Sequence, residues 1–168
     1  MINDHRSLSS KGFQLLQQLE GCKLLPYDDQ TGGRITAWIR GATIGYGHLI
    51  PIEDWKNFKW GIEKAQAIDL LRQDLKRFEA AVRQAINVSL NQHQFDALVI
   101  LAFNIGVGAF KSSSVVKLIN DPQYVTAYAS LESAWKAWKR SQGVVMVGLV
   151  CRRSTEWNLW KNAIYEEN

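Results

Sequence analysis

The sequence predicts an α+β fold that is predominantly helical, and three observations support this class. Residues 26–50 carry five glycines between short β-favouring stretches, a pattern typical of a small antiparallel sheet. Residues 63–86 repeat apolar side chains every three or four positions, as a long amphipathic helix does. Further helical stretches follow. We expect one domain over residues 1–168, with a β-rich lobe at about residues 22–62 joined by the long helix to a helical lobe and a cleft between them.

Residues 7–21 predict the first helix. Ser9 or Ser10 can supply the N-cap, apolar side chains recur on one face, and Gly21 stands where helices often end. Glu20 is therefore expected at the C-terminal end of this helix. The negative end of the helix dipole disfavours a carboxylate anion there, which suits a proton donor.

The later elements follow from the same patterns. Short strands are expected at residues 34–40 and 42–46. Asn91 and Gln94 have the spacing of a capping box and predict the start of a buried helix. The last helix is expected at about residues 149–164.

The composition is that of an ordinary soluble protein, with 46% hydrophobic and 21% charged residues in a chain of 168. The net charge of +4 suggests an anionic partner, such as nucleic acid, a membrane surface or a bacterial wall polymer. Lysines and arginines are scattered, which argues against nucleic acid. Neither a secretory apolar region nor an apolar run of membrane-spanning length is present, so we expect no stable membrane insertion and a location in the cytoplasm. A monomer is the default expectation.

The cysteines and histidines predict no metal centre. The chain has two cysteines, Cys22 and Cys151, and three histidines, without the spacing of metal ligands. A reduced, buried cysteine pair is expected in a cytosolic chain, and a disulfide formed after release is the alternative. The sequence has no nucleotide-binding glycine motif, and no cofactor is expected.

The chemically informative stretch is residues 20–48. Glu20 ends the first helical stretch, Asp28 and Asp29 follow a Pro-Tyr pair, and Thr43 opens the run Thr-Ile-Gly-Tyr-Gly-His. Hydrolysis of a glycosidic bond needs one carboxylic acid to protonate the leaving oxygen. A second carboxylate, with help from a hydroxyl, places water or stabilises the oxocarbenium-like transition state. This stretch therefore predicts a glycosidase site.

The same residues resemble the glutamate, aspartate and threonine signature of the phage-type lysozymes, or endolysins, of glycoside hydrolase family 24. Residues 94–113 and 148–156 also resemble that family, so the similarity covers nearly the whole chain. The resemblance implies a lysozyme-like fold. The segment between Asp29 and Thr43 is several residues longer than in the family, and we expect it to extend the hairpin that contains Trp38.

The resemblance implies a catalytic role for three side chains. Glu20 would be the general acid, and Asp29 would orient water or stabilise developing positive charge. Thr43 would hold the nucleophilic water, which favours inversion. The residues alone allow plainer readings, namely a solvated carboxylate, a turn aspartate and a strand threonine.

The resemblance also implies residues that bind substrate or support the site. Four residues match positions that line the saccharide cleft, each with a core or capping role as the alternative: Leu49, Phe103, Asn104 and Ser113. The Asn104 amide could bond sugar or acetamide groups in both directions. His48 is expected to form a structural hydrogen bond at the cleft edge. Arg152 is expected to reach toward Glu20, with Glu156 as a competing intrahelical partner.

The function implied is that of a bacteriolytic muramidase. It would hydrolyse the β-1,4 linkage between N-acetylmuramic acid and N-acetylglucosamine in bacterial peptidoglycan and so lyse the host, after release from the cytoplasm to the cell wall through a holin-type pore. The alternatives are a lytic transglycosylase, which cleaves the same bond without water, and a catalytically silent peptidoglycan-binding module. The presence of Asp29 and Thr43 beside Glu20 argues against both.

Overall fold

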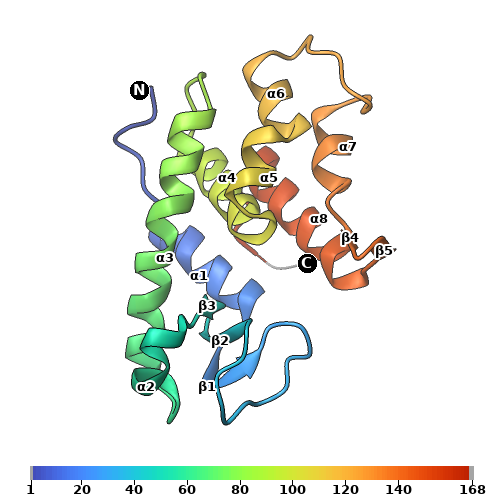
Figure 1. The fold of residues 1–168 in the computed structure, drawn as a ribbon. Helices are drawn as coiled ribbons and strands as arrows, with labels where there is room; N and C mark the ends of the chain where they lie inside the picture. The colour runs from blue at the N-terminus through green and yellow to red at the C-terminus, as the bar shows by residue number, and fades with distance from the viewer. Residues whose placement is uncertain (1, 167–168) are drawn as a thin grey trace. The chain divides into compact units, whose positions relative to one another are not determined.

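The computed structural model describes residues 2–166 and confirms the predominantly helical α+β class (Figure 1). The helices are α1 (Ser10–Glu20), α2 (Trp55–Phe58), α3 (Lys64–Ala85), α4 (Gln92–Ile105), α5 (Val107–Ser112), α6 (Ser114–Asn120), α7 (Leu131–Lys136) and α8 (Val147–Asn162), with a 3-10 turn, η1 (Ile52–Asp54). The strands are β1 (Lys23–Asp28), β2 (Ala42–Gly45), β3 (His48–Leu49), β4 (Arg140–Ser141) and β5 (Val144–Val145).

The chain divides into two compact units. The sheet unit, Glu20–Lys76, contains β1, β2, β3, α2 and the first part of α3. The helical unit consists of Met1–Leu19 and Arg77–Asn168 and contains the remaining helices with the small β4–β5 hairpin. The three residues of the catalytic hypothesis all belong to the sheet unit.

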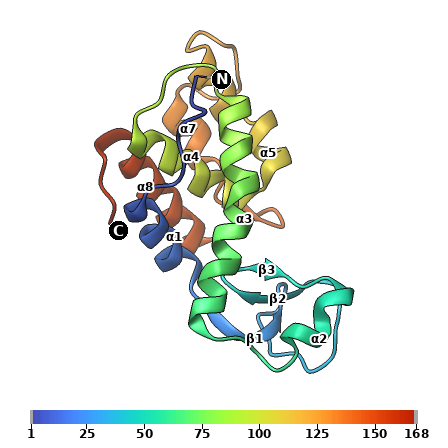
Figure 2. The same cartoon turned by 90° about the vertical axis from the view of Figure 1, so that its left-hand side faces the viewer.

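In the sheet unit, β1, β2 and β3 form an antiparallel sheet in that order (Figure 2). β2 is buried along its whole length, and its apolar side chains form the core of the unit. Thr43 of β2 stands opposite Tyr27 of β1 on one side and opposite Leu49 of β3 on the other. The apolar character of β2 therefore holds Thr43 in the central strand.

The prediction of a strand at residues 34–40 is wrong. Arg34 makes an isolated bridge to Tyr27, and the rest of the segment is irregular. Its apolar residues pack on the core instead of pairing, and the Trp38 Nε1–H donates to the Ile50 carbonyl at 2.9 Å. The partners of β2 are β1 and β3. The segment between Asp29 and Ala42 thus forms an anchored loop, and the expected extension of the hairpin is wrong.

In the helical unit, the buried carboxylate of Asp96 organises the start of α1. Ser9 is the N-cap, since its Oγ accepts from the Gly12 N–H at 3.0 Å. Asp96 accepts from the Ser9 N–H at 3.0 Å, from the Ser9 hydroxyl at 2.5 Å and from the Tyr165 hydroxyl at 2.7 Å. A Cβ on Gly12 would lie 2.8 Å from the Asp96 carboxyl carbon, so only glycine allows this approach.

Helix α4 is the most buried helix of this unit. α4 is buried from Phe95 to Ala102 and packs against α5 and α8. Its predicted start is confirmed, because the Asn91 N–H donates to Gln94 Oε1 at 2.9 Å. The long helix is confirmed as α3. The last helix, α8, begins two residues before its predicted start, after a β4–β5 hairpin that the sequence analysis did not predict.

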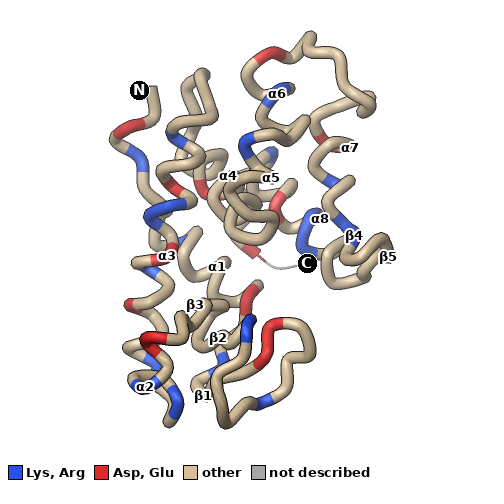
Figure 3. The backbone as a smooth tube through the Cα atoms, viewed as in Figure 1, with Lys and Arg blue, Asp and Glu red and all other residues tan. Residues whose placement is uncertain are grey.

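Charged side chains are spread along the chain rather than gathered in one tract (Figure 3). This distribution agrees with the scattered lysines and arginines of the sequence. Within residues 2–166, no helix combines the length and apolar character that crossing a membrane requires.

Candidate functional site

Glu20 is the last residue of α1, as predicted, and it is half-buried. The next residue, Gly21, has φ +62°, a conformation that glycine adopts without strain and that turns the chain away from the helix axis. The helix end and the glycine turn together hold the Glu20 carboxyl at the entrance to β1.

Asp28 and Asp29 follow each other at the end of β1 but have different environments. Asp28 accepts from the Gln30 N–H at 3.0 Å and from the Thr31 hydroxyl at 2.8 Å. These hydrogen bonds, that of the Gln30 backbone first, hold the pKa of Asp28 below its usual value. Asp28 therefore forms the turn, while Asp29 is exposed. This difference favours Asp29 as the carboxylate available to a substrate.

Gly41 connects Asp29 to Thr43. Its carbonyl accepts from the Asp29 N–H at 3.1 Å and from the Thr43 hydroxyl at 2.9 Å. Gly41 has φ +95°, and a Cβ on it would lie 2.4 Å from Asp29 Oδ1. The carboxylate of Asp29 thus lies directly against the Gly41 backbone, and a side chain at position 41 would displace it.

Tyr27 is under the electrostatic influence of both carboxylates. Burial raises the pKa of its phenol, and the negative charges of Glu20, Asp29 and Cys22 raise it further. Coulomb interactions weaken with distance, so Glu20 and Asp29 both lie within electrostatic reach of one phenol. Tyr27 is also paired with Thr43 across the sheet. The three predicted catalytic residues are therefore gathered around β1 and β2.

His48 and Leu49 occupy β3 of the same sheet. The His48 Nδ1 lies 2.9 Å from the Asp74 carboxylate of α3, and its ring packs at 5.7 Å from that of Phe58. These contacts suit the structural hydrogen-bonding role expected of His48. Leu49 is 55% exposed and is thus open to a ligand. Their places in a substrate site remain predictions.

The predicted substrate residues of the helical unit lie on α4 and at the start of α6. Phe103 is half-buried and packs on Phe78 with ring centroids 4.9 Å apart, while Asn104 is exposed. Ser113 is buried and caps α6, since its Oγ accepts from the Val116 N–H at 3.2 Å. The capping alternative for Ser113 is thus realised, and its contact with substrate remains a prediction.

A buried charge network holds the middle of α8. The fully buried Glu156 accepts from Arg152 Nε at 3.1 Å, from Arg153 at 2.8 Å and from the Trp135 indole at 2.9 Å. Burial raises the pKa of Glu156, and the two arginines oppose that effect. The intrahelical partner expected for Arg152 is therefore present. Its approach to Glu20 remains a prediction.

The two cysteines are free, and they differ in burial. Cys22 is half-buried, but Cys151 is exposed, so the expectation of a buried pair is wrong for Cys151. The reason is that the next two residues of α8, Arg152 and Arg153, take the buried face of the helix. Among residues 2–166, no three histidine, cysteine or acidic side chains are grouped so that they could hold a metal ion.

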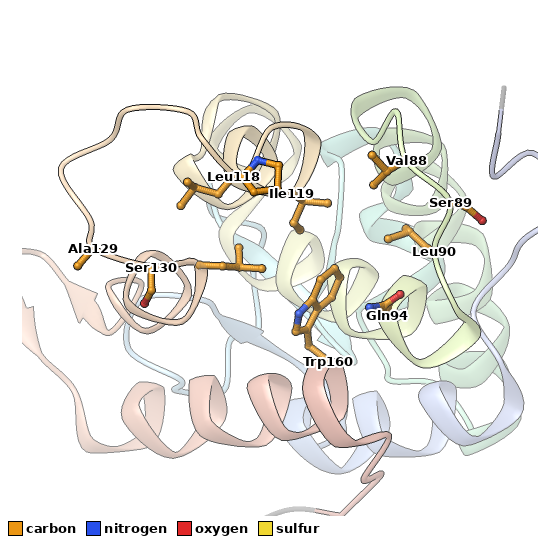
Figure 4. A pocket seen from close by; sticks show the side chains of 11 residues that line it. Val88, Ser89, Leu90, Gln94, Leu118, Ile119, Ala129, Ser130 and Trp160 are labelled. Atoms are coloured by element: carbon orange, nitrogen blue, oxygen red, sulfur yellow. The ribbon is translucent and has the colours of Figure 1, made fainter.

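The helical unit also contains a pocket of about 370 Å³ that is separate from these residues (Figure 4). Its walls are mainly apolar and include the side chains of Leu90, Leu118, Ile119, Leu131 and Trp160. No carboxylate lines it, so it lacks the groups that glycosidic hydrolysis needs. We therefore assign the candidate site to the Glu20, Asp29 and Thr43 group.

Three residues that contact the predicted site residues cannot be identified from the sequence alone. Gly41 was noted only as a breaker between strands, although it contacts both Asp29 and Thr43. Asp74 appears in the sequence as one polar position of a long helix, with no sign that it meets His48. Arg153 stands next to Arg152 in the same motif, and this adjacency was the only available signal.

Known proteins are similar to this chain over most of its length. The family model described as phage lysozyme matches residues 17–156. The endolysin of Bacillus phage PZA is 37% identical over 155 residues, which cover 92% of this chain and 55% of that protein. The endolysin of Acyrthosiphon pisum secondary endosymbiont phage 1 is 33% identical over 156 residues, covering 93% of this chain and 99% of that protein. The chain thus spans about half of the first relative and nearly all of the second.

A solved structure agrees with the sequence comparisons. The endolysin from Escherichia coli O157:H7 phage FAHEc1 is similar with a TM-score of 0.74 and 30% sequence identity. The match covers 96% of this chain and 98% of that one. The similarity therefore extends over both units, and the family match at residues 17–156 spans the stretch that contains the candidate site.

Proposed function

This chain belongs to the phage lysozyme family, and on that premise we propose that it hydrolyses bacterial peptidoglycan as a muramidase. The bond cleaved is the β-1,4 linkage between N-acetylmuramic acid and N-acetylglucosamine. The reaction transfers a proton to the leaving oxygen and adds water to the anomeric carbon, and it needs no cofactor.

Each catalytic residue has one task in this proposal. Glu20 protonates the glycosidic oxygen as the bond breaks. The nucleophilic water donates hydrogen bonds to Asp29 and Thr43 and attacks from the opposite face, which inverts the anomeric centre. The Thr43 hydroxyl donates its own proton to the Gly41 carbonyl, so its oxygen is left to accept from that water.

The observation that carries the proposal is the role of Gly41. One carbonyl accepts from the Asp29 N–H and from the Thr43 hydroxyl, which fixes that hydroxyl relative to the backbone that bears the Asp29 carboxylate. Such positioning is a large part of enzymatic rate enhancement. Besides burial, the larger cause, Glu20 and Asp29 both raise the pKa of Tyr27, which pairs with Thr43 across the sheet.

The same proposal names the partner and the site of action. The net charge of +4 favours approach to an anionic wall polymer. The protein acts as a monomer on peptidoglycan, after it leaves the host cytoplasm through a holin-type pore. Size-exclusion chromatography with light scattering tests the monomer, and a lysis assay with and without a holin tests the route of release.

The main test compares the wild type with Glu20→Gln in a turbidity assay on peptidoglycan. Loss of the general acid should lower the rate about 10²–10⁴-fold, with the helical circular dichroism unchanged. Glu132→Gln, which removes an exposed carboxylate of α7, is the matched control and should keep full activity. Equal activity of the Glu20 variant and wild type would remove Glu20 from its role.

Product analysis separates hydrolysis from its two rivals. Hydrolysis leaves reducing muramic acid ends, whereas a lytic transglycosylase leaves anhydro-muramyl ends. Mass spectrometry of the digest distinguishes them by the mass of one water. A protein that sediments with peptidoglycan but releases no fragments would instead be a silent binding module.

A further inference from the structure

The sheet unit contains a shallow pocket of about 290 Å³ between β1 and the segment that joins α2 to α3 (Figure 2). Leu24, Leu25 and Trp60 form its apolar side, and Glu63 and Gln66 form its polar side. None of the residues assigned to catalysis lines it. The unit therefore has a second concave surface, on which apolar and polar groups lie next to each other.

Trp60 is the most unusual residue of this pocket, because its side chain is 85% exposed. An indole ring in water gains free energy when a partner with an apolar surface covers it. The Lys59 Nζ lies 5.2 Å from the centroid of the ring, a cation–π contact that restricts the indole and still leaves most of it in solvent. Trp60 thus offers a large apolar surface to a ligand.

The backbone next to Trp60 is fixed against β1. The Ile62 N–H donates to the Leu24 carbonyl at 2.9 Å. Gly61 has φ +96°, and a Cβ on it would lie 2.8 Å from the same carbonyl oxygen, so glycine permits this close approach. The indole therefore extends from an ordered turn, and binding a ligand would cost less conformational entropy than on a flexible loop.

Gln66 presents an amide donor at the same pocket. Its Oε1 accepts from the Glu63 N–H at 2.8 Å, and since a backbone N–H can only donate, the amide oxygen is the atom that faces it. Within residues 2–166 the structure records no hydrogen bond from the Gln66 Nε2, and the residue is exposed. The Glu63 carboxylate is exposed as well and can only accept. A donor and an acceptor thus stand beside the apolar side of the pocket.

We propose that this pocket binds one sugar unit of a glycan strand, with the pyranose ring stacked on Trp60 and its polar groups bonded to Gln66 and Glu63. This inference rests on the proposed function and adds an attachment site outside the catalytic residues. Because the proposed substrate is a polymer, a second contact with the wall raises the local concentration of strands around the enzyme.

The chemistry of the pocket favours a sugar over a lipid surface. The faces of a β-linked pyranose carry C–H groups and its rim carries hydroxyls, which matches an apolar side with polar groups next to it. A sugar hydroxyl can accept from Gln66 and donate to Glu63. The phosphate of an anionic lipid can only accept, and the negative charge of Glu63 would repel it.

The main test measures binding to purified cell walls by sedimentation in the Glu20→Gln background, in which the strands are not consumed. Adding Trp60→Ala should raise the Kd about 10-fold, because the stacked ring is lost. Trp60→Phe keeps an aromatic ring and should recover most of the affinity. Tyr124→Ala is the matched control, since it removes an exposed aromatic ring that also has a lysine, Lys117, 5.4 Å from its centroid. It should bind walls as the Glu20→Gln parent does.

Gln66→Glu tests the polar side of the pocket in the same background. The new carboxylate still accepts from the Glu63 N–H, but the outward donor is replaced by an acceptor. The Kd for walls should rise about 5-fold while the thermal midpoint stays the same. A purely structural role of Gln66 would show the reverse, a lower midpoint with unchanged wall affinity.

Nuclear magnetic resonance with a soluble probe, the tetramer of β-1,4-linked N-acetylglucosamine, shows whether Trp60 itself meets the sugar. The indole N–H signal of Trp60 is assigned by its loss in Trp60→Phe. This signal should shift as the tetramer is added, and in Gln66→Glu the shift should need a higher concentration of the tetramer.

The outcomes separate this inference from the proposed function. Equal wall affinity with and without the Trp60 ring, or a Trp60 signal that the tetramer does not move, would overturn the inference. It would also be overturned if Trp60→Ala abolished binding to phosphatidylglycerol vesicles and left wall binding unchanged, since the surface would then bind lipid. If wild type releases no fragments from walls but Trp60→Ala weakens wall binding, the proposed function fails and the glycan site stands.

Discussion

The acidic residues of the two units differ in burial. In the helical unit, Asp96 and Glu156 are fully buried, and each accepts from several donors. In the sheet unit, Glu20 is half-buried and Asp29 is exposed. The first kind stabilises the fold, and the second kind is accessible from solvent.

This comparison teaches that burial alone does not identify a catalytic carboxylate. A buried carboxylate surrounded by donors has no capacity left for a reacting group, although its pKa is shifted. The backbone of the catalytic candidates is positioned by a helix end at Glu20 and by Gly41 at Asp29. Substitutions in the two units should therefore affect different properties.

The largest expected effect on stability is that of Glu156→Gln. Removal of the charge takes away the carboxylate that Arg152 and Arg153 share in the buried interior, which should lower the free energy of unfolding by about 3–5 kcal/mol. Chemical denaturation monitored by circular dichroism measures it. Glu132→Gln, which breaks an exposed pair with Lys136, should leave the midpoint unchanged. Equal stability of both variants would contradict the contrast between the two kinds of carboxylate.

The next effect is on activity, through Gly41→Ala. The new Cβ would meet Asp29 Oδ1 at 2.4 Å and the backbone would be strained at φ +95°. We expect peptidoglycan hydrolysis to fall about 10²-fold and stability to fall by about 1–3 kcal/mol. Gly143→Ala is the matched control. It has φ +81° and open space around its Cβ, so it should show a loss of stability without the loss of activity. A similar loss of activity in both would assign the effect to strain alone.

The smallest effect is a pH dependence in the helical unit. Burial, followed by the hydrogen bond to Asp96, raises the pKa of Tyr165 to about 12 from 10.0. The folded state therefore keeps a proton that the unfolded state loses. The resulting stability is present below pH 10 and declines as the pH rises through about 12. Thermal midpoints measured from pH 9.5 to 11.5 should fall less steeply for Tyr165→Phe than for wild type. Parallel curves would show that Tyr165 does not contribute.

Most of the fold could be predicted because it follows from local patterns. The 3.6-residue apolar period located α3, and the capping pair Asn91 and Gln94 located α4. The sheet was harder to predict because pairing joins distant residues. Residues 34–40 have β-favouring side chains but use them to pack on the core. In contrast, β1 contains Pro26, although proline is unfavourable in strands.

The candidate site was predicted residue by residue from motif resemblance, but its supports were not. Asp74 and Arg153 act through contacts that the fold creates between segments far apart in sequence, and Gly41 acts by joining the two ends of a loop at Asp29. The hydrogen bond that orients the Asn104 side-chain amide likewise comes from Arg153, which is 49 positions away. No local pattern encodes such a pair, because either residue alone has many ordinary roles.

The loop between Asp29 and Gly41 is closed at its base by the hydrogen bond from the Asp29 N–H to the Gly41 carbonyl, and next to it Asp28 pairs with Ala42. Because these contacts hold the two ends together, residues can be gained or lost inside the loop at a modest entropic cost, about 0.6 kcal/mol for each doubling of length. Evolution can therefore lengthen or redecorate this segment while the geometry at its root is inherited unchanged.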